Sequence, residues 1–331
     1  MGSVLESTDV KNKLEDLSGV VIKPGENPYN ALIDACHSNP AEIQALYSAH
    51  RVRRNAQQKE KFLAADYKEL IIDQHLLRLE DQSIEPGYVD PRHCMVFWGR
   101  PPWHIIELAA EVQRRLKVAA PSLWLMPMPR MHITALELAH SRTAEEIAAI
   151  RTTLEPAIPA IANHTLHHRA RLVKPMVSYD LSALALSFLP AAGEVSPTSA
   201  PATSASVSDT TTTTTTTMKQ HDDNYTYHHL RRDLWNTSKD AGLQIDSRYV
   251  VPSAHITLGR YLTDADHDTP EKRASWVAAI DEVNAWLEAE VWDKEDVAAA
   301  QWLVGQERGL DVRVGTLWYG GGRTVMTGEG F

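Results

Sequence analysis

The same order of predicted elements occurs twice in this 331-residue chain, and this repeat limits the possible folds more than any other feature. Each copy has a helix, an apolar strand with the tripeptide His-Ile-Thr, a second helix and two further strands. The first copy spans about residues 91–189 and the second about 221–331. Aligning Leu172 with Leu303 also places Leu186 on Leu317, so the apolar pattern continues into the last strand of each copy.

The elements of the repeat predict a mixed fold of helices and strands. An apolar strand over 93–98 precedes a helix that carries Ile105, Leu108, Val112 and Leu116 on one face. We therefore predict an α+β fold with two duplicated βα lobes and two antiparallel sheets around a central cleft.

Two segments lie outside the repeat. Residues 1–90 predict an irregular and then helical extension, with Asn39 as an N-cap before Pro40 and a basic run over 51–61. A solvated helix face is the favoured interpretation of that run, and contact with RNA is the alternative. Residues 190–220 are rich in Ser, Thr, Ala and Pro and predict a disordered insert, because they cannot bury enough apolar area to fold.

Composition narrows the partners and the compartment. A net charge of −10 argues against binding along extended duplex nucleic acid, which leaves a small nucleotide or an RNA terminus as the expected partner. Cys36 and Cys94 are too few for a disulfide scaffold, and we expect a reducing compartment, the cytoplasm or alternatively the nucleus. The sequence has no basic leader and no apolar run of about 20 residues, so no membrane association is expected. The oligomeric state is left open.

The two His-Ile-Thr motifs combine residue types suited to phosphodiester chemistry. On a strand, His132 and Thr134 point to one face while Ile133 points to the other, and His255 and Thr257 repeat this arrangement. With a pKa near 6.5, one imidazole can be the base and the other the acid near neutral pH, which predicts a bell-shaped rate profile there. The threonine hydroxyls can donate to phosphate oxygens. No metal or other cofactor is expected.

A third tripeptide of the same pattern shows that the motif alone is weak evidence. His267-Asp268-Thr269 lies in a polar segment at a predicted helix start, where Thr269 is expected to be an N-cap. Only the other two copies lie in apolar strands at equivalent places of the repeat. The spacing of His164, His167 and His168 could hold a metal, but no carboxylate or cysteine cluster follows, and a helix end is the favoured interpretation.

The segments MHITALE and AHITLGR resemble the 2H phosphoesterase superfamily, which includes RNA-ligase-like cyclic phosphodiesterases. The resemblance covers about residues 92–319. It implies that both histidines are catalytic, that Thr134 and Thr257 bind phosphate, and that the substrate is a 2′,3′-cyclic phosphate of a nucleotide or an RNA end. Possible further substrate contacts lie beside the motif strands: Arg130, Arg260, Tyr249 and Tyr261. Surface ion pairing is the favoured interpretation of the two arginines, and core packing is the usual role of strand aromatics.

Two alternatives to a cyclic phosphodiesterase remain open. The first is a protein that binds a nucleotide or an RNA end without turnover, although binding alone would not require both histidines. The second is an enzyme that joins RNA ends, but the sequence contains no P-loop that would support nucleotide charging.

Overall fold

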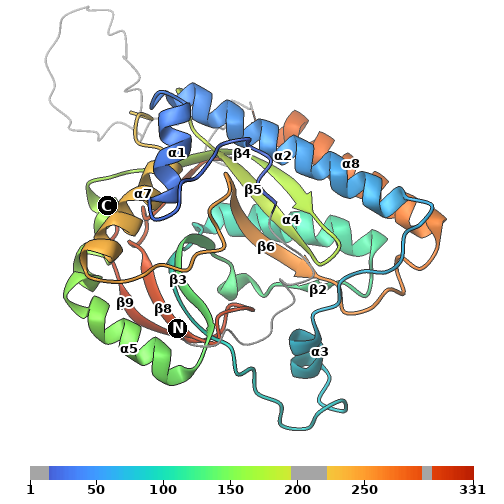
Figure 1. The fold of residues 1–331 in the computed structure, drawn as a ribbon. Helices are drawn as coiled ribbons and strands as arrows, with labels where there is room; N and C mark the ends of the chain where they lie inside the picture. The colour runs from blue at the N-terminus through green and yellow to red at the C-terminus, as the bar shows by residue number, and fades with distance from the viewer. Residues whose placement is uncertain (1–14, 195–221, 293–299) are drawn as a thin grey trace, which may run out of the picture.

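The computed structural model describes residues 15–194, 222–292 and 300–331, so most of the predicted insert lies outside the described residues. The described strands form one antiparallel sheet, with helices packed around it (Figure 1). The strands are β1 (His93–Gly99), β2 (Trp124–Leu125), β3 (Ile133–Arg142), β4 (Arg171–Tyr179), β5 (Ala183–Pro190), β6 (Ala254–Arg260), β7 (Trp302–Leu303), β8 (Asp311–Gly315) and β9 (Arg323–Thr327). The α-helices are α1 (Pro28–Ala35), α2 (Pro40–Leu63), α3 (Gln74–Glu80), α4 (Trp103–Ala119), α5 (Ala144–Leu154), α6 (Ile158–Ala162), α7 (Tyr227–Asp240) and α8 (Pro270–Leu287). Short 3-10 turns are η2 (Met128–Arg130), η3 (Glu155–Ala157) and η4 (His164–Leu166), and η5 (Glu288–Trp292) is a π-helical turn.

The order of strands corrects one part of the predicted architecture. Neighbouring strands run β7-β4-β5-β6-β3-β1-β8-β9, and β2 pairs with the end of β6. The α+β class is confirmed, but the prediction of two separate sheets is wrong, because β3 and β6 pair at Ile133 and Ile256 and join everything into one sheet. The copies also exchange strands, since β5 pairs with β6 and β8 pairs with β1. The duplication itself stays a prediction.

The last strand of the second copy, in which the repeat places Leu317, is shorter than expected. It ends at Gly315, and the chain turns before returning as β9, which pairs antiparallel with β8. Gly320 and Gly322 have φ values of 75° and 69°, a backbone region that glycine enters without a Cβ clash. The apolar residues Leu317 and Tyr319 therefore lie in this turn and not on a strand.

Helix starts follow the capping signals in the sequence. Asn39 accepts a hydrogen bond from the backbone of Ala41 at the start of α2. Thr143 forms a capping box with Glu146 on α5, and Thr269 accepts from the backbone of Lys272 on α8. Each cap satisfies backbone N–H groups that have no partner inside the helix. The helix starts predicted at Asn39 and Thr269 are confirmed.

The amino-terminal extension belongs to the same core as the rest of the chain. Helix α1 packs on α7, and α2 packs on β4 and β5 beside α8 (Figure 1). Tyr29, Ile43 and Phe62 are fully buried in the apolar cluster that also contains Phe97 and Ile256. Residues of the extension therefore help to hold the sheet, and removing them would expose this shared core.

The basic run on α2 divides into two sets. Arg53, Lys59 and Lys61 are exposed, as expected for a solvated face. Arg51 is buried, and the Arg54 side chain is largely buried against Asp180, so a solvated face is the wrong interpretation for these two.

Helices α2 and α8 cover the outer edge of β4. The Val177 backbone N–H donates to Asn284 Oδ1 at 2.7 Å, and the side-chain amides of Asn55 and Asn284 donate to the Val177 carbonyl at 3.0 and 3.1 Å. The Trp292 indole donates to the Pro175 carbonyl at 2.7 Å. An uncovered strand edge would leave such groups open to pairing with another chain. These bonds also fix α2 to the sheet.

His267, in the third motif copy, gives a prediction about acid stability. Its ring is buried among Phe62, Tyr261 and Trp276, and no hydrogen-bond partner for either ring nitrogen is present in the described chain. Burial lowers the pKa of His267 to about 4, below the value near 6.5 of an unfolded chain. The unfolded state therefore binds the proton more readily, and stability present above about pH 6.5 is lost as the pH falls.

Replacing His267→Phe keeps an aromatic ring in this cluster but removes the titration. The free energy of unfolding of the parent should fall between about pH 7 and about pH 5. In the variant we expect this fall to be smaller by about 2 kcal/mol. Urea denaturation at both pH values measures this. An equal loss in the two proteins would contradict the assignment.

Candidate active site

The two motifs meet at the centre of the sheet. Ile133 on β3 lies directly opposite Ile256 on β6, and both are fully buried. In an antiparallel pair this register places His132 across from Thr257 and Thr134 across from His255, all on the other face of the sheet. These four side chains line one pocket, here called the motif pocket.

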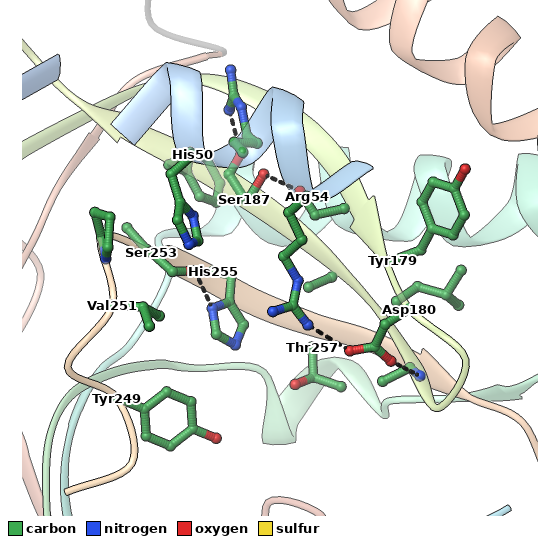
Figure 2. A pocket seen from close by; sticks show the side chains of 18 of the residues that line it. His50, Arg54, Tyr179, Asp180, Ser187, Tyr249, Val251, Ser253, His255 and Thr257 are labelled. Carbon is green, nitrogen blue, oxygen red and sulfur yellow. Dashed lines mark hydrogen bonds and ion pairs between the residues drawn. The ribbon is translucent and has the colours of Figure 1, made fainter. Parts of the chain in front are cut away.

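A second pocket continues from the first towards α2 (Figure 2). This α2 pocket is lined by residues of α2, by the β4–β5 hairpin, by the segment before β6 and by β6 itself. Six lining residues are shared by the two pockets: Arg248, Tyr249, His255, Thr257, Arg260 and Trp318. The two pockets are therefore parts of one cleft, and His255 and Thr257 lie where they join.

His132 is held on two sides. Its ring stacks on Trp98, with centroids 3.7 Å apart and planes at 16°, and its Nδ1 lies 2.7 Å from the Arg130 carbonyl. A carbonyl can only accept, so Nδ1 carries the proton and the neutral ring has its lone pair on Nε2. Since Nδ1 is used by the backbone, Nε2 is the nitrogen left for a ligand.

His255 is held through a hydroxyl. Its Nδ1 lies 2.9 Å from Ser253 Oγ, as Figure 2 shows, and the Tyr249 ring lies 5.9 Å away between centroids. A serine hydroxyl can either donate or accept. Ser253 can therefore support both the neutral and the protonated imidazole, in contrast to the carbonyl beside His132.

The pKa values of both imidazoles lie well below the ordinary range. Burial lowers the pKa of His132 to about 3; the Arg130 carbonyl opposes the shift, and Arg100 adds to it. Burial lowers the pKa of His255 to about 4, with Arg54 as the next cause. Burial and nearby positive charge therefore favour the neutral form of both rings.

The threonines offer free donors. Thr134 uses its backbone carbonyl to accept from the Tyr227 hydroxyl at 2.7 Å. Within the described ranges, neither the Thr134 nor the Thr257 hydroxyl has a hydrogen-bond partner, and both line the motif pocket. A phosphate oxygen between the two strands could accept from either of them.

A bulge in β6 turns Arg260 into the cleft. Leu184 pairs with Gly259, whereas Ala185 pairs with Thr257, so β6 has one extra residue here. In a regular strand, side chains alternate between the two faces, so residue 260 would lie on the face opposite to Thr257. The extra residue in the bulge shifts this alternation by one, and Arg260 lies on the same face as Thr257. Arg260 consequently lines both pockets. Its Nη1 is 3.7 Å from Asp73 Oδ2, and its Nε has no partner in the described part of the chain.

The other predicted contacts differ in their placement. Tyr249 lines both pockets. Tyr261 does not line either pocket: it is buried in the core, where its hydroxyl accepts from the Trp276 indole at 3.2 Å. Arg130 is exposed and lines neither pocket, and only its carbonyl serves the site, through His132.

Several cleft residues have no signal in the sequence. Trp98 stacks on His132, and the Arg248 guanidinium is 4.3 Å from the Trp318 ring and donates to Glu137 Oε1 at 2.9 Å. These residues come from β1, β3 and the segments before β6 and β9. The alternation of side chains along β1 could have predicted which face of the sheet carries Trp98. It could not have predicted that Trp98 stacks on His132.

Histidines outside the cleft do not assemble a metal site. Across residues 15–194, 222–292 and 300–331, no group of three or more His, Cys, Asp or Glu side chains could hold a metal ion. His164 stacks on His168 with centroids 4.6 Å apart, and its Nε2 lies 2.9 Å from the Tyr225 hydroxyl. His164 lies in η4, which follows α6, whereas His167 and His168 are exposed. Over the same ranges, no helix has the length and apolar character needed to cross a membrane.

Comparison with models of known protein families finds no match to this chain, and no curated protein matches its sequence. The geometry of the cleft is therefore the main basis for a functional assignment.

Proposed function

We propose that this protein hydrolyses a cyclic phosphodiester, the 2′,3′-cyclic phosphate of a nucleotide or of an RNA end. The observation that carries the proposal is the register of β3 and β6 at Ile133 and Ile256. This register places the imidazole of His132 across from the hydroxyl of Thr257, and the hydroxyl of Thr134 across from the imidazole of His255. Resemblance of the motifs to the 2H phosphoesterases supports the same chemistry.

The arrangement provides each part of an in-line displacement. Water attacks phosphorus while one imidazole accepts its proton, and the bond from phosphorus to the 2′ or 3′ oxygen breaks as the second imidazole donates a proton to that oxygen. The hydroxyls of Thr134 and Thr257 donate to the non-bridging oxygens, where negative charge accumulates. Arg260, which has an unused Nε donor, adds positive charge beside them.

The different partners of the two rings assign their roles. His132 keeps its proton on Nδ1 for the Arg130 carbonyl and offers the Nε2 lone pair, which suits the base. His255 lies beside a serine hydroxyl that can accept from a protonated ring, which suits the acid. The bound phosphate anion would favour the imidazolium at His255.

Direct assay tests this proposal. The protein is incubated with each 2′,3′-cyclic nucleotide and with a cyclic-phosphate RNA oligomer in excess chelator, and the position of the product phosphate is determined. We expect turnover of at least one substrate that persists in the chelator. Absence of turnover with all of them would overturn the hydrolase, and loss only with chelator would overturn the metal-free mechanism.

The lowered pKa values predict the pH dependence. The profile of kcat/KM follows ionisations of the free protein, where the pKa values of His132 and His255 are about 3 and about 4. We expect kcat/KM to be highest on the acid side of neutrality and to fall as rising pH removes the proton from His255. The fall in kcat should come at higher pH, because the bound phosphate raises the pKa of His255.

Initial rates from about pH 3 to about pH 9 measure both profiles. Activity is assayed again at neutral pH after each acid incubation, since acid also destabilises the fold through His267. A maximum of kcat/KM above about pH 7 would contradict the assignment.

A further inference from the structure

The cleft continues beyond the motif residues into a part of the molecule that the repeat does not include. Four side chains of α2 line the α2 pocket, among them His50 and Arg54. In the view of Figure 2, Arg54 extends from α2 towards Asp180 on one side of His255, and Tyr249 and Val251 lie on the other side. The amino-terminal extension therefore forms a wall of the cleft next to His255.

The guanidinium group of Arg54 has N–H donors that make no hydrogen bond within the described residues. Its Nη2 donates to Asp180 Oδ2 at 2.7 Å, and only 18% of its side chain is exposed. A guanidinium has five N–H donors, and within the described residues this is the one hydrogen bond that Arg54 makes. Its charge also reaches His255, because it helps to lower the pKa of that ring. A ligand at the motifs can therefore meet Arg54 without breaking its bond to Asp180.

The backbone around Arg54 is held firmly. On α2, Arg51 donates to the carbonyls of Lys174 and Ser187 at 2.8 and 3.2 Å, and Asn55 donates to the sheet edge. Asp180 is fixed from its other oxygen, since Oδ1 accepts from the backbone N–H groups of Ser182 and Ala183. The pair is preorganised, which reduces the entropy lost when a ligand binds.

Arginines outnumber carboxylates in the lining of the α2 pocket. The whole protein has a net charge of −10, yet four arginines and a single carboxylate line this pocket. The carboxylate is Asp180, and the arginines are Arg51, Arg54, Arg248 and Arg260. Ion pairs with Asp180, Glu137 and Asp73 offset the charges of Arg54, Arg248 and Arg260, but the N–H donors that these pairs leave unused still match phosphate geometry. Apolar side chains such as Val251 and Leu184 line the same pocket and suit the body of a nucleoside.

We propose that the α2 pocket binds a second phosphate of the substrate, with Arg54 as its contact. This inference rests on the proposed function and makes it more specific. The cyclic phosphate would lie between the two motifs, and a further phosphate on the same or the adjoining nucleotide would lie beneath α2. The substrate class is thus a nucleotide with at least one phosphate besides the cyclic one.

Binding measurements test the subsite independently of turnover. The His132→Asn variant is titrated calorimetrically with adenosine 2′,3′-cyclic phosphate, with the same compound carrying a 5′-phosphate, and with a diadenosine dinucleotide ending in a 2′,3′-cyclic phosphate. We expect the second phosphate to lower Kd at least about 10-fold, the effect of a charge-assisted hydrogen bond. Adding Arg54→Gln should remove this gain and change the Kd of the first compound little.

Arg53→Gln is the matched control, because Arg53 is the neighbouring arginine on α2 but is exposed and donates to the Leu17 carbonyl. It should keep the full gain. Arg54→Lys, which retains charge but not the planar fork, should keep part of it, and this second variant serves if Arg54→Gln does not fold. Thermal unfolding of each variant checks the fold.

Each outcome decides a separate question. A gain for the 5′-phosphate alone identifies a terminal phosphate, and a gain for the dinucleotide alone identifies an internucleotide phosphate; both support the subsite. Equal Kd values for all three compounds, no binding of any of them, or a gain that persists in Arg54→Gln would overturn it. Arg54-dependent binding without hydrolysis by the parent protein would leave the subsite in place and overturn the proposed function.

Discussion

Replacing His132→Asn or His255→Asn is expected to lower kcat/KM for a 2′,3′-cyclic phosphate by about 10³-fold. Asparagine can still donate from near the Nδ1 position to the partner of each ring, the Arg130 carbonyl or Ser253 Oγ. It has no group at the Nε2 position, where proton transfer takes place. The substitution therefore removes the chemistry and keeps the local hydrogen bond.

The double variant gives a further expectation. The two imidazoles act in one displacement, so losing both should cost little more than losing either one. His167→Ala is the control, because His167 is exposed and lies outside the cleft. Single-substitution effects below about 10-fold, with the fold intact by circular dichroism, would contradict a catalytic role for that histidine.

Replacing Thr134→Val or Thr257→Val is expected to lower kcat by about 10²-fold, the effect of losing one donor to a developing negative charge. Valine has the shape of threonine and is equally favourable in a strand. Because neither hydroxyl has a partner in the described structure, the melting temperature should change little.

The matched variants Thr134→Ser and Thr257→Ser keep the hydroxyl and should retain most of the activity. Steady-state kinetics on all four variants separate a hydroxyl effect from a packing effect. If valine and serine reduce kcat equally, the hydroxyls do not contact the phosphate.

Local features of the fold could be predicted because they depend on neighbours in the chain. The helix starts at Asn39, Thr143 and Thr269 follow from side chains that cap adjacent N–H groups. The strand over 93–98 and the strand carrying His132 follow from apolar periodicity. The face shared by His132 and Thr134 follows from the two-residue period of a strand.

Contacts between distant segments could not be predicted in the same way. The pairing of Ile133 with Ile256 joins residues more than 100 positions apart in the sequence, and the exchange of strands between the two copies joins residues more than 60 positions apart. The bulge that turns Arg260 into the cleft is visible only when β5 and β6 are paired. Tyr261, next to it, points into the core, which sequence proximity to the motif could not reveal.

The sequence by itself determined the residue types of the site: two histidines and two threonines in apolar strands, each pair on one strand face. Only the tertiary structure decided that these strands are neighbours, that burial and nearby arginines lower both imidazole pKa values, and that α2 brings Arg54 beside His255. The physical reason is that strand alternation and capping act over a few residues, whereas desolvation and charge depend on every segment that packs around a group.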